Sequence, residues 1–482
     1  MRQKIHAWLK QENVTSMSLY AISLLMMKGT SLIMLPFMAA YLSPNEFGHL
    51  ELLSITTVFF SLLVGLSMHE NLYRFVGTVK LDTERFTRVC ELCTSSLVTS
   101  VLLASVFAIL FSFVFLTTAI SSHQAAIITL VISVEAPLAI CLAWLRLNNK
   151  AWIFFKVSLA TLIIQISLIV SILVTSPNVT LIFAVGGLCT VVQTAYLYIH
   201  NRFIFKFPSL EHYKKYLRYS SPLMLSAILA FGLSGAERWI IAESHPLETL
   251  GIYAVAAKFA LALGILIQPF HMWWMPKRFE LLETQGREKA VHHTQHGISA
   301  LCILSILVTW ISQSFINLAL PSSYHLASQL VVLCIIIMLL KEMAELLNIG
   351  VLYAQKTHRL FYINVIATVI ALSLAWYMKH LGVSMILLCL CLGQLVRIVL
   401  IAYLSQSSYP LPYKTKSLIL TMIISVLFIS SSWHNSSIAV AMLMMVIQPI
   451  ALIILLNRLN LIEIDLYFFK RHSPQDRVGR ML

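Results

Sequence analysis

The stretch VTSMSLYAISLLMMKGTSLIMLPFMAAY occupies residues 14–41 and carries one charged side chain, Lys28. An apolar run of this length can cross the hydrocarbon core of a bilayer, which is about 30 Å thick. The whole chain is 59% hydrophobic and only 11% charged. This composition excludes a soluble globular domain and predicts an all-α polytopic membrane protein.

Thirteen further apolar runs follow the first, so the sequence predicts about fourteen transmembrane helices. The connecting segments are short, which leaves no room for a separate soluble domain. The predicted spans lie at roughly 14–41, 49–73, 89–117, 124–145, 157–176, 179–200, 219–242, 250–275, 298–320, 325–352, 360–378, 382–404, 417–433 and 438–456.

Lysine and arginine residues are distributed unequally between the two sides of these spans. Of 34 such residues, 28 lie in one alternating set of loops together with the two termini, and the other set holds only Lys379. Cytoplasmic loops are enriched in Lys and Arg, so both termini are predicted to be cytoplasmic. The net charge of +14 therefore reflects membrane topology and does not predict binding of nucleic acid.

Two parts of the chain share a pattern that predicts an internal repeat. Gly48 precedes Arg74 by 26 residues, Gly251 precedes Arg278 by 27, and a Phe follows each arginine. A six-helix repeat would leave this pattern, and its two copies would have the same orientation because six is even. The predicted domains are an N-terminal six-helix lobe at 1–205, a second lobe at 206–410, and an added helix pair with a cytoplasmic tail at 411–482.

The five remaining cations lie inside predicted spans, where a charge is costly and marks either a functional site or a pair. No acidic residue lies within reach of Lys28 on its own helix, so it faces a cavity or a partner on another helix. Lys258 is near enough to a span end to reach the membrane surface, so it either lines a cavity or extends to that surface. The five are Lys28, Arg238, Lys258, Lys341 and Arg397.

Several carboxylates also lie within the spans. Lys341 and Glu345 are four residues apart, which predicts a salt bridge on one helix face. Glu342 then points elsewhere, and Glu135 lies near the centre of its span. These two are the candidates for titratable carboxylates within the membrane.

Adjacent residues on a helix point about 100° apart. We therefore expect Arg238 and Glu237 not to pair with each other. Arg397 has Gln394 three residues before it on the same helix face and no acidic residue in its own span.

Motifs for enzymatic or metal chemistry are weak in this chain. His292, His293 and His296 have helical ligand spacing, but no acidic motif completes a metal site. The sequence contains no phosphate-binding glycine loop, no nucleophile elbow and no H-E-x-x-H. We therefore predict a protein that is not an enzyme and has no metal and no cofactor.

The N-terminal region resembles a known signature. Lys28-Gly29, Pro36, Tyr41-Leu-Ser-Pro44, Glu46-Phe-Gly48 and Arg74-Phe75 resemble the bacterial polysaccharide transporters. These are the O-antigen and capsule flippases of the multidrug/oligosaccharidyl-lipid/polysaccharide exporter superfamily. The resemblance implies two six-helix lobes in a V shape and a location in the bacterial inner membrane.

The same resemblance implies an activity. Such proteins move undecaprenyl-diphosphate-linked oligosaccharide from the cytoplasmic to the periplasmic leaflet by alternating access. Related lipid II flippases use cations of helices 1 and 8 toward the diphosphate, which here points to Lys28 and Lys258, with Arg397, Arg238 and Lys341 as further candidates. The expected partners are the lipid-linked oligosaccharide, membrane lipids, a polysaccharide polymerase and a chain-length regulator, and the chain is expected to be monomeric.

Two alternative functions remain. One is an exporter of cationic drugs in the same superfamily, which would favour an acidic cavity. The other is a membrane polysaccharide polymerase or ligase, which would need a sizeable outer loop, whereas the predicted outer loops are short.

Overall fold

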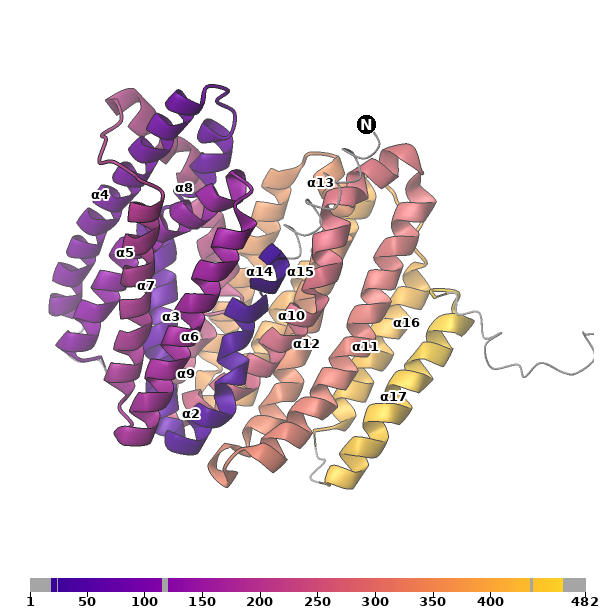
Figure 1. Ribbon diagram of the computed structural model, residues 1–482. Coiled ribbons are helices and arrows are strands. Elements are labelled where there is room, and N and C mark those ends of the chain that lie inside the picture. Colours follow the sequence, from indigo (N-terminus) through magenta and orange to yellow (C-terminus); the bar gives the residue numbers. More distant parts are fainter. Residues whose placement is uncertain (1–18, 24, 115–119, 434–436, 463–482) are drawn as a thin grey trace, which may run out of the picture.

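The computed structural model describes residues 19–23, 25–114, 120–433 and 437–462, and its regular elements in these ranges are all helices. Figure 1 shows two helical bundles side by side. The first contains the span Leu19–Tyr41, which ends in α2 (Leu35–Tyr41). It continues with α3 (Pro44–Gly65), the short π-helix η1 (Leu72–Val76), α4 (Asp82–Val114), α5 (Ser122–Leu147), α6 (Ala151–Thr175) and α7 (Val179–His200).

The second bundle begins with α8 and is followed by a terminal helix pair. Figure 1 shows this pair, α16 and α17, along the flank of the second bundle that faces away from the first. The bundle consists of α8 (Leu210–Gly232), α9 (Glu237–Ser244), α10 (Leu247–Thr284), α11 (Arg287–Ala319), η2 (Ser322–Tyr324), α12 (Ala327–Leu347), α13 (Ile349–Tyr353), α14 (Thr357–Tyr377), η3 (Lys379–Leu381) and α15 (Val383–Ser408). The pair is α16 (Thr415–Ser431) and α17 (Ile438–Arg458).

The structure confirms the predicted all-helical membrane fold with two lobes and an added pair. Among the described residues, 11 helices are long and apolar enough to cross a membrane, and α8 with α9, bent by 48°, makes up to 12. The two other predicted spans correspond to α12, which carries three charged residues, and to α16, which has 17 residues. The count of fourteen stays a prediction.

The motif between the first two spans forms a helix break and a new helix start. Leu42 is extended, and the Ser43 hydroxyl accepts a hydrogen bond from the Glu46 amide. The Glu46 carboxylate in turn accepts one from the Ser43 amide at 2.8 Å. Pro44 occupies the first turn, where its missing N–H costs nothing. The sequence Leu-Ser-Pro-Asn-Glu therefore fixes where α3 begins.

Helices α3 and α10 join the two lobes, and they touch most closely near their first residues. A Cβ atom added to Gly48 would lie 1.9 Å from the Leu247 carbonyl oxygen, and one added to Gly251 would lie 1.9 Å from the Pro44 carbonyl oxygen. Each glycine thus faces the residue four positions before the other. This reciprocity matches the correspondence of Gly48 and Gly251 in the predicted repeat. We call this region the closed end.

Helix α8 packs against both lobes. Its N-terminal half packs on lobe one, where Tyr216 is buried among lobe-one residues and the Ser220 hydroxyl faces Met68. Its C-terminal end packs on lobe two, where a Cβ added to Gly232 would lie 2.5 Å from Thr368. The predicted boundary at 205/206 therefore falls before a helix that spans both bundles, and the division into domains stays a prediction.

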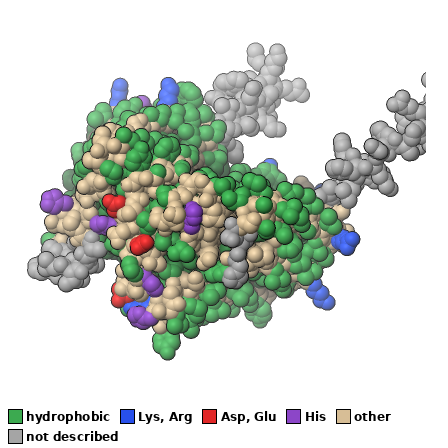
Figure 2. All heavy atoms as spheres, turned by 90° about the horizontal axis from the view of Figure 1, so that it is seen from below, with side chains coloured by type: hydrophobic (Ala, Val, Ile, Leu, Met, Phe, Trp, Pro, Cys, Tyr) green, Lys and Arg blue, Asp and Glu red, His purple; other side chains and the backbone are tan. Residues whose placement is uncertain are grey.

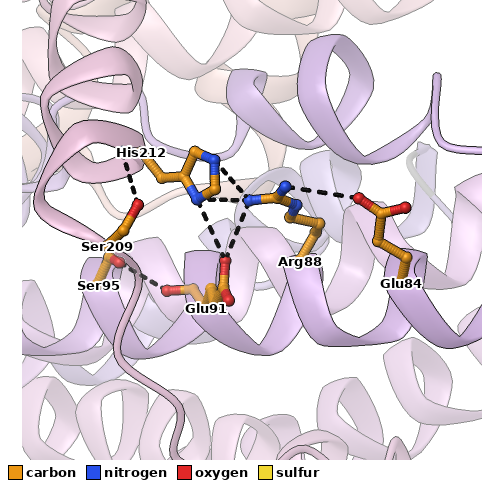
Figure 3. Close-up of polar contacts among 6 residues, drawn as sticks. All are labelled: Glu84, Arg88, Glu91, Ser95, Ser209 and His212. Carbon is orange, nitrogen blue, oxygen red and sulfur yellow. Dashed lines mark hydrogen bonds and ion pairs between the residues drawn. The ribbon is translucent and has the colours of Figure 1, made fainter.

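A polar cluster fastens the start of α8 to α4 (Figure 3). The Arg88 guanidinium lies between His212 and Glu84, and Glu91 lies 3.6 Å from it. Arginine only donates hydrogen bonds, so the ring nitrogen of His212 that meets it acts as an acceptor. The cluster connects the start of α8 to α4 of lobe one.

We expect Gly48→Ala to lower the thermal midpoint of the purified protein, because the new methyl group would overlap the Leu247 carbonyl oxygen. Overpacking of this kind costs about 1–3 kcal/mol. Gly29→Ala is the matched control, since nothing lies within 4 Å of an added Cβ there. Equal midpoints for the two variants would show that α3 and α10 do not meet at Gly48.

Candidate functional site

Charged side chains of the spans gather in two clusters. The closed-end cluster lies between the lobes and consists of Glu51, Glu237, Arg238, Tyr253 and Lys258. The lobe-two cluster lies among α10, α12, α14 and α15 and consists of His271, Arg278, Lys341, Glu342, Glu345, Asn348, Asn364 and Arg397.

Glu51 is the centre of the closed-end cluster. Its carboxylate accepts a hydrogen bond from Arg238 Nε at 2.7 Å and lies 3.8 Å from Lys258 Nζ. Glu51 belongs to α3 of lobe one, whereas Arg238 and Lys258 belong to α9 and α10 of lobe two. The side chains of all three are less than one-fifth exposed. One carboxylate therefore holds two cations of the opposite lobe at the interface.

The prediction that Arg238 and Glu237 do not pair is wrong. Arg238 Nη1 donates to Glu237 Oε1 at 2.6 Å, and the Tyr253 hydroxyl donates to the same oxygen at 2.7 Å. The Cβ atoms of neighbouring helical residues do diverge, but the long arginine side chain bends back along the first turn of α9. Arg238 thus has carboxylates from both lobes.

Two hydrogen bonds reinforce the closed end. Trp239 Nε1 donates to Thr56 Oγ1 at 3.2 Å. The Tyr324 hydroxyl donates to the Leu42 carbonyl oxygen at 2.8 Å, which connects η2 to the turn before α3. Both bonds cross between the lobes, so separating the lobes here would leave polar groups in need of new partners.

In the lobe-two cluster, Glu345 pairs with Arg397 instead of Lys341. Arg397 Nη2 lies 2.5 Å from Glu345 Oε1, and Arg397 Nε donates to Asn364 Oδ1 at 2.9 Å. The second Glu345 oxygen accepts from Asn348 Nδ2 at 3.1 Å. The predicted Lys341–Glu345 salt bridge is therefore wrong. Glu345 pairs instead with the guanidinium of Arg397 on α15, which Asn364 also positions by a hydrogen bond.

Arg278 extends this network toward the end of α10. Its Nη1 donates to Asn348 Oδ1 at 3.2 Å. Burial lowers the pKa of the Arg278 guanidinium, and the nearby Glu345 carboxylate opposes this shift. Asn348 therefore connects a cation of α10 with the carboxylate that holds Arg397.

Glu342, Lys341 and Lys28 form the less constrained part of the site. Glu342 Oε2 lies 3.5 Å from His271 Nδ1. Glu342 also interacts electrostatically with Lys341 of its own helix and with Lys28 of lobe one. Lys28 is exposed, and within the described ranges neither lysine forms an ion pair. The structure thus brings Lys28 and Glu342 into electrostatic reach across the lobes.

Glu135 lies apart from both clusters. It faces a cavity of about 540 Å³ within lobe one, which α3, α5, α6 and α7 line together with the first span and Lys258. The Glu135 side chain is solvent-accessible in mid-span, because it borders this cavity, and it accepts a hydrogen bond from Ser61.

The histidine run does not form a metal site in the described residues, where no three His, Cys, Asp or Glu side chains are grouped to hold an ion. The rings of His292 and His296 are tilted by 57° with centroids 4.0 Å apart, and His293 packs on Trp273 and Trp274.

Comparison with known proteins assigns the family. The sequence pattern of a family described as polysaccharide biosynthesis protein matches residues 37–277, which is half of the chain. The chain belongs to this polysaccharide biosynthesis protein family. No curated protein sequence matches it.

Solved structures share the fold. The chain is similar to the lipid II flippase MurJ in an inward closed conformation, at 13% identity and a TM-score of 0.67, over 91% of this chain and 98% of that chain. It is also similar to a MATE in complex with MaD3S, at 14% identity, a TM-score of 0.49, and coverage of 81% and 95%. This member of the polysaccharide biosynthesis protein family therefore shares the fold of that lipid II flippase.

We expect Glu51→Gln to open the closed end, because it removes the anion that Arg238 and Lys258 share. Breaking a buried ion pair by removing one partner costs about 3–5 kcal/mol. A cysteine at Ser54, which lines the cavity one turn further along α3, should then react about tenfold faster or more with an impermeant maleimide added on the closed-end side.

Glu46→Gln is the matched control, because glutamine preserves the capping box while removing a nearby carboxylate. Labelling of both variants is measured in spheroplasts and in inside-out vesicles, against the same background without the Ser54 cysteine. Labelling of both variants at the rate of the parent would show that Glu51 does not hold the closed end together.

Proposed function

We propose that this protein is a flippase for undecaprenyl-diphosphate-linked oligosaccharide, such as an O-antigen repeat unit. It would move this lipid from the cytoplasmic to the periplasmic leaflet of a bacterial inner membrane. The observation that carries the proposal is Lys28, an exposed cation in mid-span that forms no ion pair in the described structure. The family and the fold shared with a lipid II flippase support it.

A diphosphate is a suitable ligand for this lysine. Phosphate oxygens in a medium of low dielectric constant need cations and charge-assisted hydrogen bonds, and an unpaired lysine supplies both. Lys341, also without an ion pair among the described residues, provides a second cation on the opposite lobe. The prenyl chain stays in the apolar phase of the membrane, where it has no polar group to satisfy.

The remaining cations have a different role in this conformation. Glu51 and Glu237 hold Arg238 and Lys258, and Glu345 holds Arg397. When the closed end separates, Arg238 and Lys258 lose Glu51 and become available to the diphosphate. In this scheme the substrate and Glu51 compete for the same cations, which links substrate binding to opening.

The closed end is assigned to the periplasmic side. Its loops contain one lysine, Lys379, which pairs with Glu243. Figure 2 views the molecule from the lower end of Figure 1, and lysine and arginine are sparse on that face. Both termini then lie in the cytoplasm.

Two carboxylates are candidates for coupling to a proton or sodium gradient. Glu342 is the stronger one, because it lies beside His271 and within electrostatic reach of Lys28. A change of charge at Glu342 alters the field at the proposed diphosphate site directly. Glu135 is the second, since it is accessible from the lobe-one cavity.

The cations disfavour the alternative of a cationic drug exporter, because Lys28 and Lys341 would repel such cargo. The short connections between the described spans disfavour a polymerase or ligase with a large external catalytic loop. We propose that the flippase acts as a monomer, binds no nucleic acid, and supplies a polysaccharide polymerase and its chain-length regulator.

We expect Lys28→Ala to reduce surface polysaccharide about tenfold or more, because the diphosphate loses a charge-assisted hydrogen bond. Lipid-linked oligosaccharide should accumulate on the cytoplasmic leaflet. Lys28→Arg should restore most of the polysaccharide, since it preserves the charge. Polysaccharide is measured by gel, and membrane insertion by immunoblot.

Lys80→Ala serves as control, because Lys80 is an exposed loop lysine outside the helices. Normal polysaccharide in the Lys28→Ala strain would remove Lys28 from the site. Normal polysaccharide in a strain that lacks the whole protein would overturn the proposed function itself.

A further inference from the structure

The cavity in lobe one is large, and its otherwise apolar wall carries a group of polar side chains. Its volume is about 540 Å³, within the range of about 300–1,000 Å³ that small-molecule sites occupy. Amide and hydroxyl side chains from three helices face it: Ser54 and Thr57 from α3, Ser158, Thr161 and Gln165 from α6, and Thr190 and Gln193 from α7. Such a cavity needs a polar occupant or water.

Two of these side chains have buried polar atoms without a partner. Gln193 is 7% exposed and Ser158 is 5% exposed. Gln193 Nε2 and Ser158 Oγ have no hydrogen-bond partner in the described part of the chain. Leaving a buried polar group unpaired costs about 1–3 kcal/mol. Two such groups on the wall of one cavity are available to hydrogen-bond an occupant of it.

The chemistry of the wall fits a sugar better than a cation. Gln193 Nε2 is a donor, and a donor needs an acceptor such as a sugar hydroxyl or ring oxygen. The wall combines neutral amides and hydroxyls with two carboxylates, Glu51 and Glu135, and these groups can donate to and accept from several hydroxyl groups at once. Glu51 already pairs with Arg238 and Lys258. A metal or sodium ion would need converging oxygen ligands and far less space.

The position of the cavity relative to Lys28 also fits. Thr30 and Ser31, on the same span as Lys28, line the cavity wall, and Lys258 lines it from lobe two. A diphosphate at Lys28 therefore places the attached saccharide next to the cavity. The prenyl chain, on the other side of the diphosphate, remains in the membrane.

We propose that the lobe-one cavity is a saccharide subsite, in which Gln193 and Ser158 hydrogen-bond the sugar nearest the diphosphate. This inference rests on the proposed function and deepens it, because it assigns recognition of the sugar to lobe one. Lys28 then binds a part common to all such lipids, and Gln193 and Ser158 bind the part that differs.

The test compares two lipids on the full chain in nanodiscs. One is the lipid-linked oligosaccharide purified from a strain that lacks this protein, and the other is undecaprenyl diphosphate without sugar. We expect the parent to bind the oligosaccharide lipid more tightly. Gln193→Leu should lower this preference about fivefold, the equivalent of one neutral hydrogen bond, and should leave binding of undecaprenyl diphosphate unchanged. Ser158→Ala is expected to act in the same direction.

Gln295→Leu is the matched control. Gln295 is 4% exposed, its Nε2 also has no partner among the described residues, and it lies on α11 away from the cavity. Equal preferences in Gln193→Leu and Gln295→Leu would overturn the subsite. Loss of bound sodium in Gln193→Leu without a change in preference would also overturn it, in favour of a cation site.

The outcomes separate this inference from the proposed function. If the parent binds neither lipid, the proposed function fails and the subsite fails with it. If the parent binds both lipids and Lys28→Ala weakens both, the proposed function stands whatever Gln193→Leu shows. Only a selective loss of the oligosaccharide lipid in Gln193→Leu supports the subsite.

Discussion

The rest of the interface depends on the contact of α3 and α10 at Gly48 and Gly251, where each glycine lies against the other helix's backbone. Residues three and seven positions further along a helix lie on the same face. Glu51 follows Gly48 by three residues and Lys258 follows Gly251 by seven, so the glycine contact directs both toward the interface. Without that close approach, Glu51 could not bridge Lys258 and Arg238.

This arrangement lets a membrane protein keep cations in its interior. A buried charge needs a partner, and in this conformation Arg238, Lys258 and Arg397 each have a carboxylate. The pairs that cross the lobes exist only while the lobes are together. Separating the lobes would leave Arg238 and Lys258 without Glu51, which costs free energy. An anionic substrate that replaced Glu51 would remove this cost, so the ion pairs that keep the protein closed also make its opening sensitive to the substrate.

The sequence predicted the helical class correctly, because hydropathy acts on each span separately, and it also identified the cations within the spans. The sidedness stays a prediction. The sequence failed on partners. Lys341 and Glu345 satisfy the local spacing rule, yet Arg397 arrives from another helix with Asn364 beside it. Glu51 was not predicted as a site residue, because a carboxylate near the end of a span costs little free energy on its own. Gln193 was not predicted either, since a neutral amide within a span does not indicate a binding site until its neighbours in space are known.

The two lobes share a helix order but differ in chemistry, and this difference follows from the cargo that we propose. Lobe two has titratable groups around Glu342 and His271, suited to a change of charge. Lobe one has a cavity around Gln193 with amide, hydroxyl and carboxylate side chains on its wall, suited to hydroxyl groups. Lys28 lies between them, in reach of Glu342 and on the span that lines the cavity. A substrate with a charged diphosphate and an uncharged saccharide would therefore engage both lobes at once, and its release would require both sets of contacts to change together.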